Sequence, residues 1–190
     1  MDTRSAAALA RNDRYVREFV EGFNFCPYAK RCHETGKLHR VVLLGETDLA
    51  QAVDAAILRF EQMPPDAIEV GLIIIPAFDQ GARAFEMLAG AARERMQARH
   101  ARGDTPFYCV AFHPALTEDL SDEHRAVRFL RRSPDPTLQL VRAGVLRKVR
   151  GSDPHGEDVS VSDRIARANL DTLRREGVDK LRALLSRMKK

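Results

Sequence analysis

Long apolar runs and a secretion signal are both missing from this chain of 190 residues. Its longest apolar stretch lies near Val70–Ile75, far short of the roughly 20 residues that a membrane-spanning helix needs. The N-terminus has no apolar core of a signal peptide. The three cysteines are an odd number, which together with the missing signal indicates free thiols. We therefore expect no membrane association and a cytoplasmic location.

Several motifs that carry well-known chemistry are also absent. The chain contains no G-x-G-x-x-G, no G-x-x-x-x-G-K-[ST] and no G-x-S-x-G, which argues against the common nucleotide-binding enzymes and serine hydrolases. It has no C-x-x-C pair and no H-E-x-x-H, so a structural zinc site with four ligands is not expected. The 31 basic and 27 acidic residues give a net charge of +4 without a basic block rich in aromatics. This mixed surface disfavours nucleic acid as a partner and is compatible with a small anionic ligand.

The residues that are present predict a soluble α/β protein. Hydrophobic residues make up 44% and charged residues 31% of the chain, as in ordinary globular proteins, and one domain over residues 1–190 is the expectation. Apolar periodicity predicts helices at 13–23, 49–60 and 82–99 and strands at 40–44, 68–75 and 106–113. Strands joined by helical crossovers predict a small sandwich of two or three layers with a short, mainly parallel sheet.

The C-terminal third is predicted to be helical. From His124 onward the pattern favours helices only, including one within Pro134–Arg150. The polar stretch Gly151–Asp158 is predicted to be a loop, and Ser160–Asp163 matches a capping box before the next helix. The last helix is expected to break at Gly177.

The most distinctive local feature is Cys26 directly before Pro27. Proline favours the first position of a helix, so a helix beginning at Pro27 would put Cys26 at its N-cap, next to the positive end of the helix dipole. That position stabilises a thiolate, and Lys30 and Arg31 would add positive charge nearby. We therefore predict a reactive Cys26; the alternative is a small apolar residue packed under the proline.

Two further segments are candidates for a site. His113 ends the third predicted strand, and ligands of open parallel sheets bind outside the carboxyl ends of strands; alternatively, the histidine only fixes the turn. The two arginines Arg131 and Arg132, followed by Ser133, precede Pro134 and a predicted helix, where an arginine fork and free backbone N–H groups can bind a carboxylate or phosphate. The alternative there is a rigid loop with solvated arginines.

These segments together resemble a bacterial family known as domain of unknown function 1415 (DUF1415). The resemblance is carried by Asn24–Lys30, Phe112–Pro114 and Arg132–Arg142. The tail is also similar to the C-terminal pattern of that family, at Ile165, Asn169, Leu173, Gly177 and Leu181. It spans nearly the whole chain and implies a small cytoplasmic protein, but no activity. The residues that it implies are shared are Cys26, Lys30, His113, Arg132 and Ser133. The stretch Ala115–Asp119 departs from the aromatic-rich stretch of the family.

Three hypotheses follow for the function. The first is an enzyme that acts on a small anionic substrate, with Cys26 and His113 as the catalytic pair. Its predicted substrate-binding residues are Asn24, Lys30, Arg132, Ser133 and Arg142. The second is a transition-metal site of Cys26 and His113, with His33, Asp79 and Glu118 as candidates for further ligands. The third is a thiol-based sensor or ligand-binding protein using Cys26 and Cys32. The identity of any metal and the oligomeric state are left open.

Overall fold

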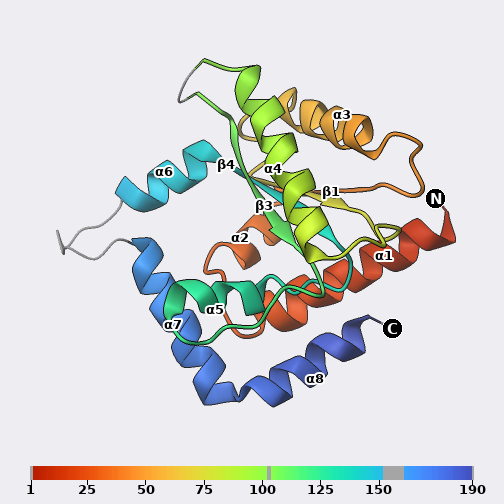
Figure 1. The fold of residues 1–190 in the computed structure, drawn as a ribbon. Helices are drawn as coiled ribbons and strands as arrows, with labels where there is room; N and C mark the ends of the chain where they lie inside the picture. Colours follow the sequence, from red (N-terminus) through yellow and green to blue (C-terminus); the bar gives the residue numbers. More distant parts are fainter. Residues whose placement is uncertain (1, 102–103, 152–160, 190) are drawn as a thin grey trace.

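A computed structural model describes residues 2–101, 104–151 and 161–189. The described chain forms three layers, with a mixed sheet in the middle and helices on both faces (Figure 1). Its strands are β1 (Leu38–Val42), β2 (Val70–Ile74), β3 (Phe107–Phe112) and β4 (Thr137–Arg142). Its helices are α1 (Thr3–Arg14), the π-helix η1 (Tyr15–Glu21), α2 (Ala29–Glu34), α3 (Leu49–Glu61), α4 (Ala82–Ala98), α5 (Glu123–Leu130), α6 (Ala143–Gly151), α7 (Val161–Glu176) and α8 (Val178–Met188). None of the helices described is long and apolar enough to cross a membrane.

The α/β class, the helical C-terminal region and the elements from β1 to β3 are confirmed. The helix α3 begins where the sequence predicts, because the Asp48 side chain accepts a hydrogen bond from the Gln51 N–H at 3.0 Å. The strand β2 carries the continuous apolar run Leu72–Ile75, which is buried as expected. Local patterns were sufficient for these elements.

The prediction of a mainly parallel sheet is wrong. The strand order is β1-β2-β4-β3, and only β1 and β2 are parallel, since β4 lies between β2 and β3 and is antiparallel to both. The prediction of helices only after His124 fails at the same place, because residues 137–142 form a strand. Pro134 and Pro136 disfavour helical backbone in the residues before them, and the run that follows alternates between the two faces of the sheet.

The N-terminal helix is longer than predicted and changes character midway. It begins at Thr3, where the Asp2 side chain accepts the Arg4 N–H, rather than at Asp13. Its second half is the π-helix η1, which presents Tyr15 and Phe19 to the core. Short π-helical segments are rare in proteins, and those that occur often lie at functional sites.

The C-terminal helices follow the prediction where they are described. Gly177 separates α7 from α8 in a left-handed conformation (φ 81°) that favours glycine. Gly151 is the last residue of α6 rather than part of a loop. The rest of the predicted loop, and Ser160 of the predicted capping box, lie outside the described residues.

Three hydrophobic clusters cover the two faces of the sheet. The helices α3 and α4 pack on one face, and η1, α5, α7 and α8 form the main cluster on the other side (Figure 1). A small third cluster joins Ala8 of α1 to Leu72 and Ile74 of β2.

Successive strand residues alternate between the faces. In β4, Leu138 and Leu140 therefore face α3 and α4, whereas Thr137, Gln139 and Val141 face the opposite helices. We call these the α3/α4 face and the helical face of the sheet.

Candidate functional site

A pocket of about 390 Å³ lies on the helical face of the sheet. It is bounded by strand residues of the sheet and by residues of η1, α2, α5, α6 and α7. Its volume is within the range of small-molecule sites. We call it the helical-face pocket.

Most of the pocket wall is apolar. The described apolar residues that line it include Tyr15, Val16, Val20, Phe25, Leu38, Val70, Leu72, Phe112, Val127, Leu130, Val141, Val145, Leu146 and Ile165. The described residues with polar or thiol groups at the wall are Asn12, Cys26, Cys32, Glu69, Arg131, Ser133, Thr137, Gln139, Ser162 and Asn169. This composition, apolar with a few polar groups, is typical of a site that binds an organic molecule.

Cys26 lies at the wall of this pocket, but not in the predicted helix position. The helix α2 begins at Ala29 with Tyr28 as its N-cap, so the expected helix start at Pro27 is wrong. Burial raises the pKa of the Cys26 thiol, and the backbone N–H groups of Tyr28 and Ala29 that face the sulfur offset this only in part. The thiol is therefore protonated at neutral pH, opposite to the expected thiolate.

Cys32 lines the same pocket from α2 and is also a free thiol. Burial and the nearby Glu69 carboxylate raise its pKa to about 11. Glu69 itself accepts hydrogen bonds from Arg31, at 3.1 Å from its Nη1, and from Lys37 at 3.4 Å. Burial alone would raise the pKa of Glu69, but these two cations lower it. The Glu69 charge is therefore already balanced by the protein.

His113 does not meet Cys26. Its neighbour Phe112 lines the helical-face pocket, and adjacent strand residues point to opposite faces. The His113 ring accordingly packs against Phe78 and Phe85 on the α3/α4 face, with ring centroids 6.4 and 5.7 Å away. The predicted catalytic pair is thus separated by the sheet, and its catalytic roles stay a prediction.

The hydrogen bonds of His113 suit a turn residue. Its Nδ1 accepts the Ala115 N–H at 3.1 Å, and its ring also interacts with the backbone of Gln80. The backbone N–H of His113 donates to the Arg131 carbonyl at 3.0 Å. Burial lowers the pKa of His113, so the neutral ring is favoured. The backbone N–H of His113 thus joins the end of β3 to the end of α5, while its side chain fixes the turn that follows β3.

Most of the predicted substrate-binding residues lie away from the pocket. Lys30 points to solvent, with 72% of its side chain exposed, next to Glu34. Asn24 is exposed in a left-handed turn. Arg142 lies on the α3/α4 face, where it donates to the Ile68 carbonyl at 2.9 Å.

The Arg132–Ser133 segment is placed differently from the prediction. It precedes the strand β4 rather than a helix. The Arg132 guanidinium is paired with Glu118 at 3.1 Å, so it is occupied by the protein. Among the predicted catalytic and substrate-binding residues, only Ser133 and Cys26 line the helical-face pocket. The Ser133 hydroxyl donates to the Asp135 carbonyl at 2.6 Å.

Arg131 belongs to the predicted arginine segment but was not chosen as a substrate-binding residue, yet it is the one cationic side chain among the described residues that line the pocket. It ends α5 and is partly buried. Across the described chain its guanidinium has no ion pair and no side-chain hydrogen bond. The doublet Arg131-Arg132 was the available signal, but the sequence does not say which arginine is paired by a distant glutamate.

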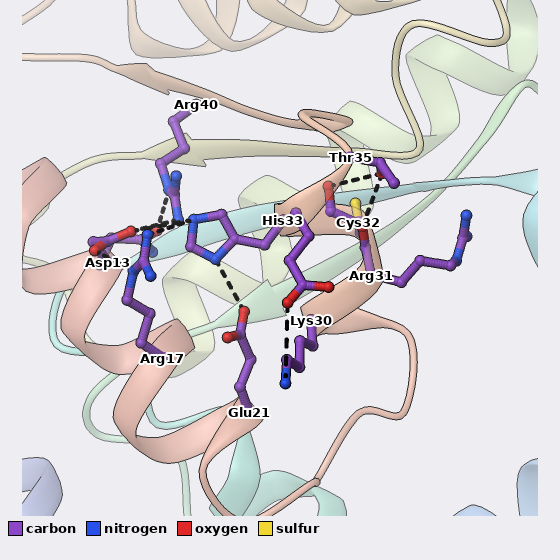
Figure 2. Close-up of polar contacts among 11 residues, drawn as sticks. Asp13, Arg17, Glu21, Lys30, Arg31, Cys32, His33, Thr35 and Arg40 are labelled. Atoms are coloured by element: carbon purple, nitrogen blue, oxygen red, sulfur yellow. Dashed lines mark hydrogen bonds and ion pairs between the residues drawn. The ribbon is translucent and has the colours of Figure 1, made fainter.

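A polar network supports the α2 side of the pocket. Figure 2 shows His33 between Glu21 and Asp13, with Arg17 and Arg40 beside them. His33 Nδ1 is 3.0 Å from Glu21 and Arg17 donates to Asp13 at 2.8 Å. These contacts tie α2 to η1 and η1 to α1, and Arg40 joins β1 to α1 through Asp13 at 3.4 Å. Within the described ranges, no three histidine, cysteine or acidic side chains are grouped so as to hold a metal ion, so the metal site stays a prediction.

Comparisons with known proteins identify a family but no activity. The model of the family described as "Protein of unknown function (DUF1415)" matches residues 7–183. No curated protein and no solved structure matches the chain.

Proposed function

Because this chain belongs to the DUF1415 family, whose description names no function, we propose a function from the pocket: the chain binds a small, mostly apolar organic acid. Arg131 is the counter-ion of its carboxylate. The apolar wall of the helical-face pocket holds the rest of the molecule.

The observation that carries the proposal is the unpaired guanidinium of Arg131 in an apolar wall. Burial lowers the pKa of Arg131, which indicates that its charge is poorly solvated. Two nearby groups already have other partners. The Glu86 carboxylate pairs with Arg128 at 2.9 Å, and the Tyr15 hydroxyl donates to the Leu130 carbonyl. A partly buried charge without a partner is costly, and a carboxylate ligand would supply that partner through two parallel hydrogen bonds.

The charge and the size of the pocket narrow the ligand class. One free cation favours a monoanion, because a phosphate dianion would need more donors than the apolar wall offers. At about 30 Å³ for each water-sized group, a volume of about 390 Å³ holds about a dozen non-hydrogen atoms. Medium-chain monocarboxylates are of this size.

Calorimetric titration with hexanoate, octanoate and decanoate tests the proposal, with octanol as the uncharged analogue. We expect octanoate to bind more tightly than octanol. The variant Arg131→Met keeps the apolar stem but removes the charge, so it should lose about 10- to 100-fold in octanoate affinity, the worth of a charged hydrogen bond, and keep its octanol affinity.

Arg132→Met is the matched control, since Arg132 is paired with Glu118 outside the pocket. It should bind octanoate as the parent chain does. Equal affinity for octanol and octanoate, or an unchanged Arg131→Met, would contradict the proposal.

A second candidate function is that of an enzyme, as the sequence predicts. The Cys26 thiol would then react with a bound derivative of the organic acid. The supporting observation is that the Cys26 sulfur lines the same pocket and faces two backbone N–H groups. Its raised pKa makes the thiol slow unless a ligand changes its surroundings. Alkylation of Cys26 by iodoacetamide should be slow in the free chain; acceleration by octanoate would support the enzyme, and no change would leave binding as the function. The free thiols also support the proposed cytoplasmic location.

A further inference from the structure

We infer that the ligand of the helical-face pocket carries, besides its carboxylate, one neutral hydrogen-bonding group, a hydroxyl or an amide, which the side-chain amide of Asn169 binds. This inference rests on the proposed function and names the substrate class more narrowly. It predicts a hydroxylated or amide-bearing organic acid rather than a plain one.

Asn169 is mostly buried, but its amide opens into the pocket and is not among the fully enclosed polar atoms that lack a partner, Asp54 Oδ1 and Arg95 Nη2. It lies on α7, is only 7% exposed and lines the helical-face pocket. Its side chain has no hydrogen-bond partner in the part of the chain that the structure describes. An amide that faces a pocket without a protein partner is available to hydrogen-bond a ligand there.

Gln139 is a second amide at the floor of the pocket, and it is partly exposed. It is the central residue of β4 on this face, with Leu72 and Val110 as its cross-strand neighbours. It also lines the pocket, and its amide has no partner in the described ranges. Two unpartnered amides in an otherwise apolar wall indicate that the ligand body is not purely hydrocarbon.

The second group of the ligand is neutral. The pocket wall has one other charged side chain among the described residues, Glu69, and Arg31 and Lys37 already balance it. No unpaired carboxylate is left there to hold an ammonium group, and no second unpaired cation to hold another anion. An amide side chain offers one acceptor and two donors, which suits a hydroxyl or an amide.

Binding of octanoate and of its monohydroxylated and terminal-amide analogues tests the inference. We expect at least one of these analogues to bind about tenfold or more tightly than octanoate, because a plain acid leaves the buried amide unpaired. In Asn169→Leu this preference should be lost, with octanoate binding unchanged or tighter. Gln51→Leu, the same kind of change on the exposed surface of α3, should keep the preference.

The outcomes separate the two proposals. If octanoate binds through Arg131 but no analogue binds more tightly, or if Asn169→Leu keeps the preference, the inference is overturned and the proposed function stands. If neither octanoate nor any analogue binds, the proposed function itself fails. Far-ultraviolet circular dichroism checks that Asn169→Leu is folded, and Asn169→Asp provides a second variant, whose negative charge should weaken octanoate binding.

Discussion

The two faces of the sheet use the same strands but are packed differently. On the α3/α4 face, Ile73, Leu138 and Leu140 are fully buried against the two helices. On the helical face, Gln139 and Val141 of the same strand remain partly accessible and border a pocket of about 390 Å³. A closely packed face provides stability, whereas an incompletely filled one provides room for a ligand.

Truncation of one leucine on each side of the sheet should show the difference in packing most clearly. Leu138→Ala removes a fully buried side chain of the α3/α4 core and should cost about 3–4 kcal/mol of unfolding free energy, from lost burial and a new cavity. Leu146→Ala on α6, which is only partly buried and borders the existing pocket, should cost only about 1–2 kcal/mol, because fewer atoms lose contacts. Urea unfolding measures both; equal costs would contradict the difference in packing.

A glycine pair tests how full the α3/α4 face is. A Cβ at Gly71 would lie 2.6 Å from the Phe60 ring, whereas one at Gly90 in α4 would meet nothing within 4 Å. Gly71→Ala should therefore destabilise the chain by about 1–3 kcal/mol through overpacking. Gly90→Ala, the matched control, should stabilise it by about 0.5–1 kcal/mol through reduced backbone entropy. A harmless Gly71→Ala in thermal unfolding would show that this face has spare room.

Substitution of Arg131 tests whether an unpaired charge at the helical face lowers the stability of the chain when no ligand is bound. Without ligand, Arg131→Met should raise the unfolding free energy by about 1 kcal/mol, because it replaces an unpaired, poorly solvated charge with an apolar side chain. Arg132→Met should instead lose up to about 1 kcal/mol, since it breaks the ion pair with Glu118. Chemical denaturation without added acids distinguishes the two signs. A loss in both variants would contradict the account of Arg131.

His113 should give the α3/α4 face a small dependence on pH. Burial lowers its pKa below the ordinary value of 6.5, so the unfolded chain takes up a proton more readily than the folded one. The contribution of His113 to the free energy of unfolding is therefore fully present above pH 6.5, and it is lost as the pH falls below that value. Urea unfolding across this range should show a shallower fall for His113→Gln than for the parent chain. An equal fall in the two chains would contradict this role of His113.

Much of the fold was predictable because its signals are local. The Asp48 cap, the apolar run of β2 and the break at Gly177 each follow from a few neighbouring residues. The strand β4 was missed because residues 137–142 carry apolar residues on both faces, which also fits a buried helix. Its place between β2 and β3 depends on long-range pairing that no local pattern contains.

The site was predictable only in part. Cys26 and Ser133 do line the pocket. His113 was expected beside Cys26, but the alternation of strand residues puts it on the other face, and that was visible only once the register of β3 was known. Whether Arg131 or Arg132 is free depends on Glu118, 14 residues away from Arg132 in sequence. Charge pairing of this kind is set by the fold rather than by the segment itself.

A crystal structure of the chain with octanoate would test the central claim most directly. We predict that the carboxylate lies against the Arg131 guanidinium at about 2.7–2.9 Å, with the hydrocarbon tail between β4 and the α6 and α7 side of the pocket. Octanoate bound elsewhere, or a pocket closed by pairing of Arg131 with a carboxylate of the protein, would contradict it.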